Sequence, residues 1–172
     1  IAVIDIFARR IADLIKTQPA RKLSWDMQDI RASLQVLVPP DVPKVGAPRY
    51  RIDHIDDLMG VMSRGRQAAG KEAKVVFFDG RTHRKVGEVR TDFAPHLMDF
   101  HPTDPRWAYV RDDAGWLHKV DLYAMRTERR IRAGLNGISL AVSRDGRFVA
   151  AGSYVPPTMV IMDAQTLEPL HL

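Results

Sequence analysis

The first pattern along the chain is a helical spacing of apolar residues near its start. Apolar positions recur at steps of three and four between Ile4 and Ile15, with charged residues between them, which is typical of an amphipathic helix. The helix should end near Thr17, because Pro19 disfavours helical geometry in the residue before it. A second, short helix is expected over Trp25 to Ser33, capped by Ser24.

The pattern then changes from helical to extended. Four prolines fall between Pro39 and Pro48, which indicates a linker or an arm laid over another domain. From Lys74 onward, short runs rich in β-branched and aromatic residues alternate with polar turns, and no helical period remains. The expected strands are Lys74 to Asp79, Lys85 to Arg90, Leu97 to His101, Arg106 to Arg111 and Leu117 to Asp121.

The β-rich part repeats itself. Phe78-Asp79 recurs as Val120-Asp121 and again as Met162-Asp163, with 42 residues between successive aspartates. A period of about 40 to 45 residues that holds four short strands is what one propeller blade requires. A single blade cannot bury both of its faces, so blades stack around an axis. The sequence therefore predicts a mainly β fold containing the first blades of a propeller, with an open sandwich as the alternative.

Composition narrows the possible functions. The net charge is +5, but lysine and arginine are interspersed with acidic residues, which argues against a nucleic-acid partner. No run approaches the roughly 20 apolar residues that span a bilayer, so no membrane span is expected. Cysteine is absent, which excludes disulfides, thiolate metal sites and covalent haem attachment within this stretch. Because the chain starts at Ile1 and stops inside a repeat, we interpret it as a piece of a longer protein.

Other candidate sites are weak. His83, His101, His118 and His171 show no metal-binding spacing, and each is expected to be structural. Residues 134–137 contain two glycines and are expected to form a turn. The sequence contains no glycine-rich phosphate loop that precedes a helix.

Several stretches resemble the cytochrome cd1 nitrite reductases and their close relatives, in the same order as in that family. The most specific is Ser153-Tyr154-Val155-Pro156-Pro157, which runs into Ile161-Met162-Asp163 and Thr166-Leu167-Glu168-Pro169. The others are Trp25 to Ser33, Lys74 to Gly80, Phe93-Ala94-Pro95-His96 and Arg111-Asp112.

The resemblance implies a domain arrangement. In that family a cytochrome c domain precedes an eight-bladed propeller that holds a d1 haem. Residues 1–22 would then be the end of the cytochrome c domain, with its C-terminal helix. Residues 23–73 would be a short helix, a proline-rich arm and the approach to the propeller, and residues 74–172 the first, incomplete set of blades. The attachment site for haem c would lie upstream of this chain.

The resemblance also implies a cofactor site. The family's proximal iron ligand follows the blade's closing aspartate by seventeen residues, which here is His96. An imidazole on a strand end suits haem iron. Arg64 and Arg111 match arginines that bind the cofactor's carboxylates, and Ser139 and Tyr154 match positions that line the pocket.

Two departures from the family pattern concern the charge of this site. Asp99 stands where the reductases carry an arginine, and Ile138 stands just before Ser139 where another arginine is usual. Losing two cations and gaining an anion should weaken the binding of the carboxylates unless other residues compensate.

The function implied by the resemblance is reduction of nitrite to nitric oxide at the d1 haem, with electrons from the c-type haem. Two alternatives are a dihydro-haem d1 dehydrogenase of d1-haem biosynthesis and a propeller that acts only as a binding scaffold. The implied partners are nitrite or a haem d1 precursor, a small electron-carrier protein and a second copy in a homodimer, and the implied location is the periplasm. No catalytic residue is expected in this stretch, which alone should be inactive.

Overall fold

The computed structural model describes residues 34, 36–37, 52, 54–65, 72–155 and 157–172. These residues all belong to one of two units of the chain, Arg31–Leu172. The helices expected over Ile4 to Thr17 and Trp25 to Ser33, and the proline-rich segment, lie outside the described residues and stay predictions. In the part that is described, no helix is long and apolar enough to cross a membrane.

The described residues are almost entirely β-structure. The elements are β1 (Val36–Leu37), the 3₁₀ helix η1 (Ile55–Asp57), β2 (Leu58–Ser63), β3 (Lys74–Asp79), β4 (Lys85–Arg90), β5 (Pro95–Phe100), β6 (Trp107–Asp112), β7 (Trp116–Asp121), β8 (Arg126–Arg132), β9 (Leu135–Val142), β10 (Phe148–Val155), β11 (Thr158–Asp163) and β12 (Pro169–His171). The five strands expected from the sequence are confirmed with bounds shifted by at most two residues. One expectation is wrong in part: residues 134–137 are not a turn, because β9 begins at Leu135.

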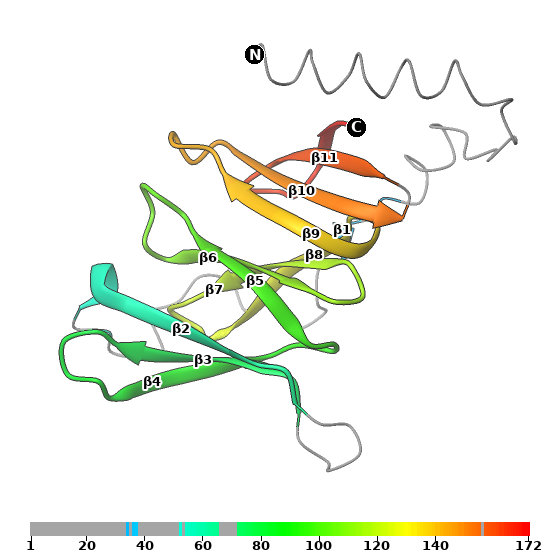
Figure 1. Cartoon of the computed structure of the whole chain (residues 1–172). Coiled ribbons are helices and arrows are strands. Elements are labelled where there is room, and N and C mark those ends of the chain that lie inside the picture. Colours follow the sequence, from blue (N-terminus) through cyan, green and yellow to red (C-terminus); the bar gives the residue numbers. More distant parts are fainter. Residues whose placement is uncertain (1–33, 35, 38–51, 53, 66–71, 156) are drawn as a thin grey trace, which may run out of the picture. The chain divides into compact units, whose positions relative to one another are not determined.

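The strands form three antiparallel sheets in chain order (Figure 1). The first is β2-β3-β4, the second is β5-β6-β7-β8 with β1 added beside β8, and the third is β9-β10-β11-β12. Each sheet is a meander of sequential neighbours, as in a propeller blade. The predicted mainly β, propeller-type fold is confirmed, whereas the eight blades and the preceding cytochrome helix stay predictions.

The 42-residue repeat has a local cause at the end of β3, β7 and β11. Each strand ends on an aspartate, Asp79, Asp121 or Asp163, whose carboxylate accepts hydrogen bonds from the backbone N–H groups two and three residues later, at 2.8 to 3.2 Å. The bond from the N–H of Thr166 is the main reason why the pKa of Asp163 lies below its usual value. An aspartate at this position therefore fixes the turn that reverses the chain into the next strand.

The two sheet-to-sheet interfaces form two hydrophobic cores. In the second sheet, side chains alternate between the faces of β6, so Tyr109 packs toward the third sheet while Ala108 and Val110 pack toward the first. Both faces of this sheet are covered, and most residues of β6 and β7 are buried. This two-sided burial is what stacking blades require.

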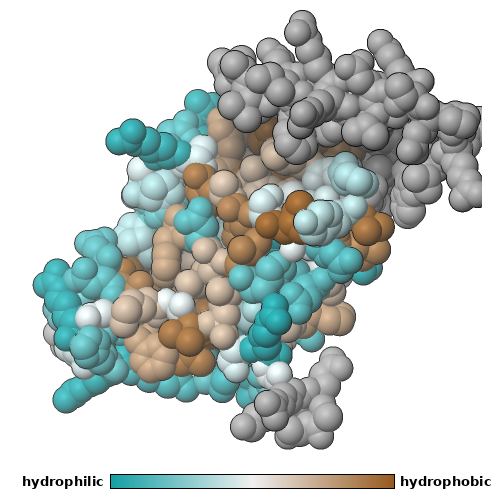
Figure 2. Space-filling model, in the orientation of Figure 1, coloured by the Kyte–Doolittle hydropathy of each residue, from teal (hydrophilic) through white to brown (hydrophobic). Residues whose placement is uncertain are grey.

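The first strands of the second and third sheets, β5 and β9, are called the inner strands here. They are less buried than β6 and β7. β2 pairs with β3 as β6 pairs with β7 and β10 pairs with β11, so β2 corresponds to β6 and β10 in sheet order. No described strand pairs with the other edge of β2. This explains why Met59, Val61 and Met62 of β2 are exposed. Figure 2 shows apolar surface on the face that β2, β5 and β9 present in Figure 1.

The turns that follow Asp79, Asp121 and Asp163 each contain a residue whose backbone adopts the left-handed conformation, with a positive φ. His83, Met125 and Leu167 have φ of 56°, 48° and 60°, and each lies four residues after the closing aspartate. A side chain at such a φ costs roughly 1–2 kcal/mol relative to the right-handed region. Met125 and Leu167 are buried, which offsets this cost, whereas His83 is exposed.

Replacing His83 by glycine should therefore stabilise the protein by about 0.5 kcal/mol. The gain is the relief of the left-handed conformation, reduced by the extra entropy of glycine in the unfolded chain. The matched control is Arg84→Gly, because position 84 does not adopt a positive φ and should lose about 0.5–1 kcal/mol. Chemical unfolding of both variants checks this, and a destabilised His83→Gly would contradict the argument.

Candidate functional site

His96 lies at an irregularity in the inner strand β5. Pro95 pairs with Asp112 and Leu97 pairs with Arg111, so His96 has no partner residue in the register between β5 and β6. Such a β-bulge redirects a side chain, and bulges are frequent next to functional sites. The structure therefore gives His96 a special backbone position that an alternating strand would not provide.

The next inner strand has a bulge at the equivalent place. On β9, Gly137 pairs with Ser153 and Ser139 pairs with Gly152, which leaves Ile138 unpaired. Ile138 lies 42 residues after His96, the offset of the blade repeat. Consecutive inner strands therefore present a histidine and an exposed isoleucine at corresponding bulges at the same end of the sheets.

Two oxygen atoms face the His96 ring. Nε2 lies 2.7 Å from the carbonyl oxygen of Gly137 in the third sheet. Nδ1 lies 3.1 Å from Oδ1 of Asp113, close enough for an ion pair but not aligned for a hydrogen bond. Because both neighbours are acceptors, a neutral ring can donate to only one of them. The side chain is 18% exposed.

His101 provides an informative comparison, because it follows the other end of β5. Its Nε2 lies 2.9 Å from the carbonyl oxygen of Gly146, also in the third sheet's chain segment. Its Nδ1, however, accepts backbone N–H bonds from Thr103 and Asp104. These donors fix Nδ1 as an acceptor and Nε2 as the donor, so both ring nitrogens of His101 have a structural role.

Arg111 is a fully buried cation between the second and third sheets. Its Nη2 donates to the carbonyl oxygen of Ala133 and to Oγ of Ser153, at 2.8 and 2.7 Å. Its Nε and Nη1 are buried and have no hydrogen-bond partner. Burial lowers the pKa of Arg111 to about 10, and the charge of Asp112 offsets part of this shift. A buried cation with unpartnered donors is suited to attract an anion.

Gly137 separates Arg111 from His96. A Cβ atom at this position would overlap Nε of Arg111, so only glycine lets the backbone pass so close to the guanidinium. The carbonyl of the same residue faces His96. Two of the five site residues expected from the sequence, His96 and Arg111, therefore both contact Gly137.

The other three expected site residues lie at the same end of the sheets. Arg64 follows β2, and its Nη2 lies 3.8 Å from Oδ1 of Asp113, the carboxylate that faces His96. Ser139 follows the bulge on β9 and is exposed. Tyr154, next to Ser153, is 65% exposed. Exposed hydroxyl groups at these positions are free to contact a bound molecule.

Asp99 binds the backbone of the neighbouring sheet, and its effect on the binding of the carboxylates stays a prediction. Its Oδ2 accepts a hydrogen bond from the backbone N–H of Val142 at 3.1 Å. This contact joins the inner strands β5 and β9 three residues beyond His96, near their far ends. The carboxylate thus serves to hold two sheets together, and its charge is directed to a backbone amide.

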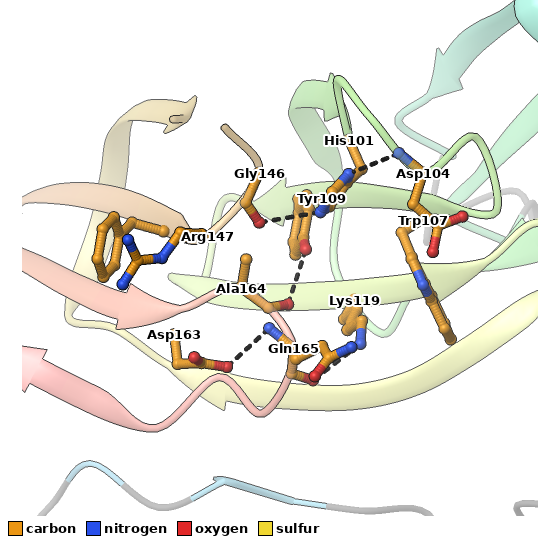
Figure 3. Close-up of a pocket in the computed structure, with 11 residues that line it drawn as sticks. His101, Asp104, Trp107, Tyr109, Lys119, Gly146, Arg147, Asp163, Ala164 and Gln165 are labelled. Atoms are coloured by element: carbon orange, nitrogen blue, oxygen red, sulfur yellow. Dashed lines mark hydrogen bonds between the residues drawn. The ribbon is translucent and has the colours of Figure 1, made fainter. Parts of the chain in front are cut away.

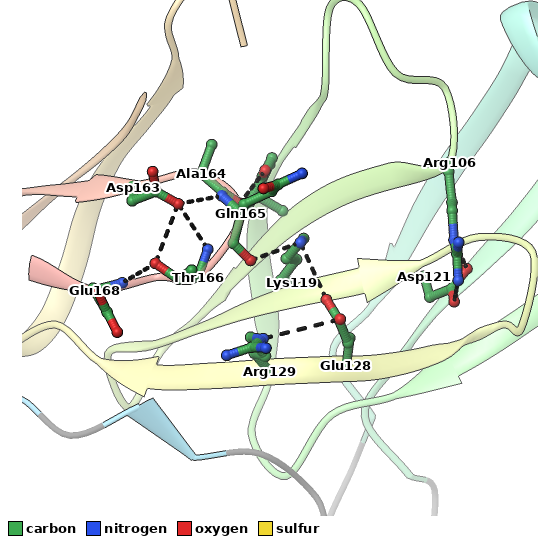
Figure 4. A network of polar contacts seen from close by, with 11 residues as sticks. Arg106, Lys119, Asp121, Glu128, Arg129, Asp163, Ala164, Gln165, Thr166 and Glu168 are labelled. Atoms are coloured by element: carbon green, nitrogen blue, oxygen red, sulfur yellow. Dashed lines mark hydrogen bonds and ion pairs between the residues drawn. The ribbon is translucent and has the colours of Figure 1, made fainter. Parts of the chain in front are cut away.

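A hollow of about 340 Å³ lies at the opposite end of these sheets (Figure 3). Two of the polar side chains that line it, Tyr109 and Lys119, bind other protein atoms. Tyr109 donates to the carbonyl oxygen of Ala164 at 2.7 Å, and the ammonium of Lys119 donates to the carbonyl oxygen of Gln165 at 2.8 Å. Figure 4 shows that Lys119 also pairs with Glu128, at 3.1 Å. We interpret this hollow as structural.

Sequence reasoning missed two residues of the candidate site, Asp113 and Gly137. Asp113 follows the conspicuous Arg111-Asp112 pair, but nothing in the local pattern shows that it faces His96. Gly137 fell in a segment expected to be a turn. Both act through contacts between sheets, and the bulges that create these contacts carry no signal that we could read in the sequence.

Repeated antiparallel sheets, with a bulged histidine on β5, define a propeller-type protein with a candidate cofactor site at one end. Residues 55–172 match the family model described as Cytochrome D1 heme domain. The chain belongs to this family, which confirms the resemblance seen in the sequence.

The chain is similar to several curated proteins, including two that match along nearly its whole length. It is 32% identical over 164 residues to a dihydro-heme d1 dehydrogenase of Pseudomonas aeruginosa, which covers 95% of this chain and 32% of that protein. It is 26% identical over 168 residues to a nitrite reductase of Stutzerimonas stutzeri, which covers 94% of this chain and 28% of that protein. The chain thus spans about a third of the length of these relatives.

A solved structure agrees with this assignment. The structure of dihydro-heme d1 dehydrogenase NirN in complex with DHE is 32% identical to this chain and superposes with a TM-score of 0.68, over 90% of this chain and 32% of that one. These comparisons favour the dehydrogenase alternative over nitrite reduction, which was the main interpretation of the sequence.

The residues present fit a haem of the d1 type. Arg111 supplies a buried positive charge with two unpartnered nitrogens, which suits an anionic macrocycle. His96 supplies an imidazole at a bulge, and Ile138 supplies apolar surface at the equivalent bulge. The described residues contain no cluster of three or more histidine, cysteine or acidic side chains that could hold a metal ion by itself, and a haem iron requires only an axial ligand from the chain.

Proposed function

We propose that this chain is part of the haem d1 domain of a dihydro-haem d1 dehydrogenase. The observation that carries the proposal is the similarity over nearly the whole chain to such a dehydrogenase, in a chain whose bulged histidine and buried arginine suit an anionic haem. In dehydrogenation the substrate would lose two electrons to an oxidised electron carrier and two protons to basic groups or water. The redox-active iron of the bound precursor would help to pass on the electrons.

The residues of this chain would bind and orient the precursor. His96 would provide the axial imidazole. The positive charge of Arg111 would attract the carboxylates, and Ser139 and Tyr154 would offer hydroxyl groups at the rim. Proton transfer to or from the reacting side chain would fall to residues outside this stretch, as expected from the sequence.

The test uses the full-length natural protein, incubated with dihydro-haem d1 and an oxidised c-type cytochrome as the electron acceptor. We expect the absorption spectrum of the precursor to convert to that of haem d1, with reduction of the acceptor. In a parallel reaction with haem d1, a reduced electron carrier and nitrite, we expect no nitric oxide above background. Absence of conversion, with bound precursor, would contradict the dehydrogenase.

Nitrite reduction is the second candidate, supported by 26% identity to a nitrite reductase over 94% of the chain. Steady release of nitric oxide in the parallel reaction would favour it. In either case we propose a periplasmic location and a c-type haem domain upstream of this stretch. A dimer and a small electron-carrier partner also remain proposals.

A further inference from the structure

We propose that Asp113 is the positioning residue for His96, holding the Nδ1 side of the imidazole so that Nε2 can bind the iron of a d1-type haem. This inference rests on the proposed function and names a residue that neither the sequence pattern nor the family resemblance singled out. The carrying observation is that Oδ1 of Asp113 lies 3.1 Å from Nδ1 of His96, on the side of the ring opposite the Gly137 carbonyl.

The geometry implies a change of partners at His96. Nε2 now faces the carbonyl oxygen of Gly137 at 2.7 Å, and an N–H in that bond cannot at the same time be an iron ligand. Ligation therefore requires the ring to leave Gly137 and to carry its proton on Nδ1. Oδ1 of Asp113 lies 3.1 Å from Nδ1 and would accept that proton once the ring has turned into line with it. Histidines that bind metals almost always donate their other N–H to a carboxylate, a carbonyl or water.

The main chain fixes the place of this carboxylate. The backbone N–H of Asp113 donates to the carbonyl oxygen of Ala94 at 2.9 Å, close to the His96 bulge. The preceding residue, Asp112, is fully buried and binds Trp116 N and His118 Nε2 at 2.9 and 3.1 Å. The backbone hydrogen bond of Asp113 and the hydrogen bonds of Asp112 therefore fix the turn that places Asp113 beside His96. The Asp113 side chain itself is half-exposed.

The arrangement also assigns a different role to Arg64. Its guanidinium is 68% exposed and lies 3.8 Å from the same Oδ1 of Asp113. An exposed pair of this kind contributes roughly 0–1 kcal/mol to stability. Arg64 therefore helps to hold the Asp113 carboxylate in place, and would act on the cofactor through Asp113 and His96.

The test compares full-length Asp113→Ala, Asp113→Asn and the wild type by titration with ferric haem d1, followed by absorption. We expect Asp113→Ala to raise Kd about tenfold, the lower end of what loss of such a partner costs at metal sites. Its ferric spectrum should shift and the reduction potential of the haem should rise, because the imidazole loses a negative partner and becomes a weaker donor. Asp113→Asn keeps an acceptor, so we expect its Kd to be close to that of the wild type.

Two controls separate the possible failures. Glu168→Gln removes a negative charge from an exposed side chain at the opposite end of the third sheet and should change neither Kd nor the spectrum. The unfolding temperature without cofactor should be the same for all variants, since the His96–Asp113 pair contributes little to stability. Wild-type affinity and spectrum in Asp113→Ala would overturn the inference alone, whereas a wild-type protein that binds no haem d1 would overturn the proposed function itself.

Discussion

Replacing His96 by alanine should weaken the binding of haem d1 by about a hundredfold, equivalent to ~2.7 kcal/mol. The variant removes the imidazole that we propose as the iron ligand, and alanine offers no group in its place. The carboxylates of the macrocycle still experience the charge of Arg111, which is why we expect residual binding. A titration of the full-length protein with ferric haem d1 measures the loss, and the absorption bands should shift at the same time.

His101→Ala is the matched control for this prediction. His101 makes the same kind of contact to a glycine carbonyl of the neighbouring sheet as His96, 2.9 Å against 2.7 Å, from the opposite end of β5. Both variants therefore lose one hydrogen bond between sheets, worth about 1 kcal/mol, but only one loses an iron ligand. If both variants bind haem d1 with wild-type affinity, His96 is a structural clasp and the ligand lies elsewhere.

The repeat could be read from the sequence because it has a local cause. Asp79, Asp121 and Asp163 each bind the backbone of the turn that follows them, so the same residue type recurs wherever the same turn recurs. The spacing of these aspartates, one in each sheet, showed the 42-residue period, and this period predicted a propeller. The individual strands of the third sheet were not predicted, and the start of β9 at Leu135 lies in a segment that was expected to be a turn.

The site could be read only in part because its contacts run between sheets. His96 was found through the resemblance and not through its surroundings, since a lone histidine near a strand has no distinctive pattern. Asp113 and Gly137 approach it only because the register of β5 and β9 shifts by one residue at each bulge. A register shift of this kind moves side chains to new positions without any requirement on residue type, so the sequence alone cannot show it.

The equivalent bulges suggest how the proposed site could bind a haem without an arginine at position 138. His96 and Ile138 occupy the same place in consecutive sheets, and Arg111 lies between these sheets, beneath Gly137. A positive charge therefore remains within the site although the exposed position carries an apolar side chain. Ile138 is then suited to pack against the macrocycle, while the positive charge is that of Arg111, on the other side of the Gly137 backbone.

The second large effect is expected for Arg111→Met, which should lower the affinity for haem d1 about thirtyfold, or ~2 kcal/mol, the size of a hydrogen bond to a charged group. The folded protein disfavours the charged guanidinium, since burial brings the pKa of Arg111 down to about 10. Because this value lies below that of an exposed arginine, the charge costs stability at neutral pH, and the cost falls as the pH rises above 10.

Methionine fills a similar volume without that cost, and Oγ of Ser153 can still donate to the carbonyl oxygen of Ala133. We therefore expect the free energy of unfolding without cofactor to stay within about 1 kcal/mol of the wild type. Arg147→Met, which removes an exposed charge at the opposite end of the sheets, should leave the affinity unchanged. If Arg111 only clamps the sheets, Arg111→Met will instead unfold more easily and bind haem d1 as well as the wild type. The buried charge and the two unpartnered nitrogens of Arg111 are the reason why we expect the loss of affinity and not the loss of stability.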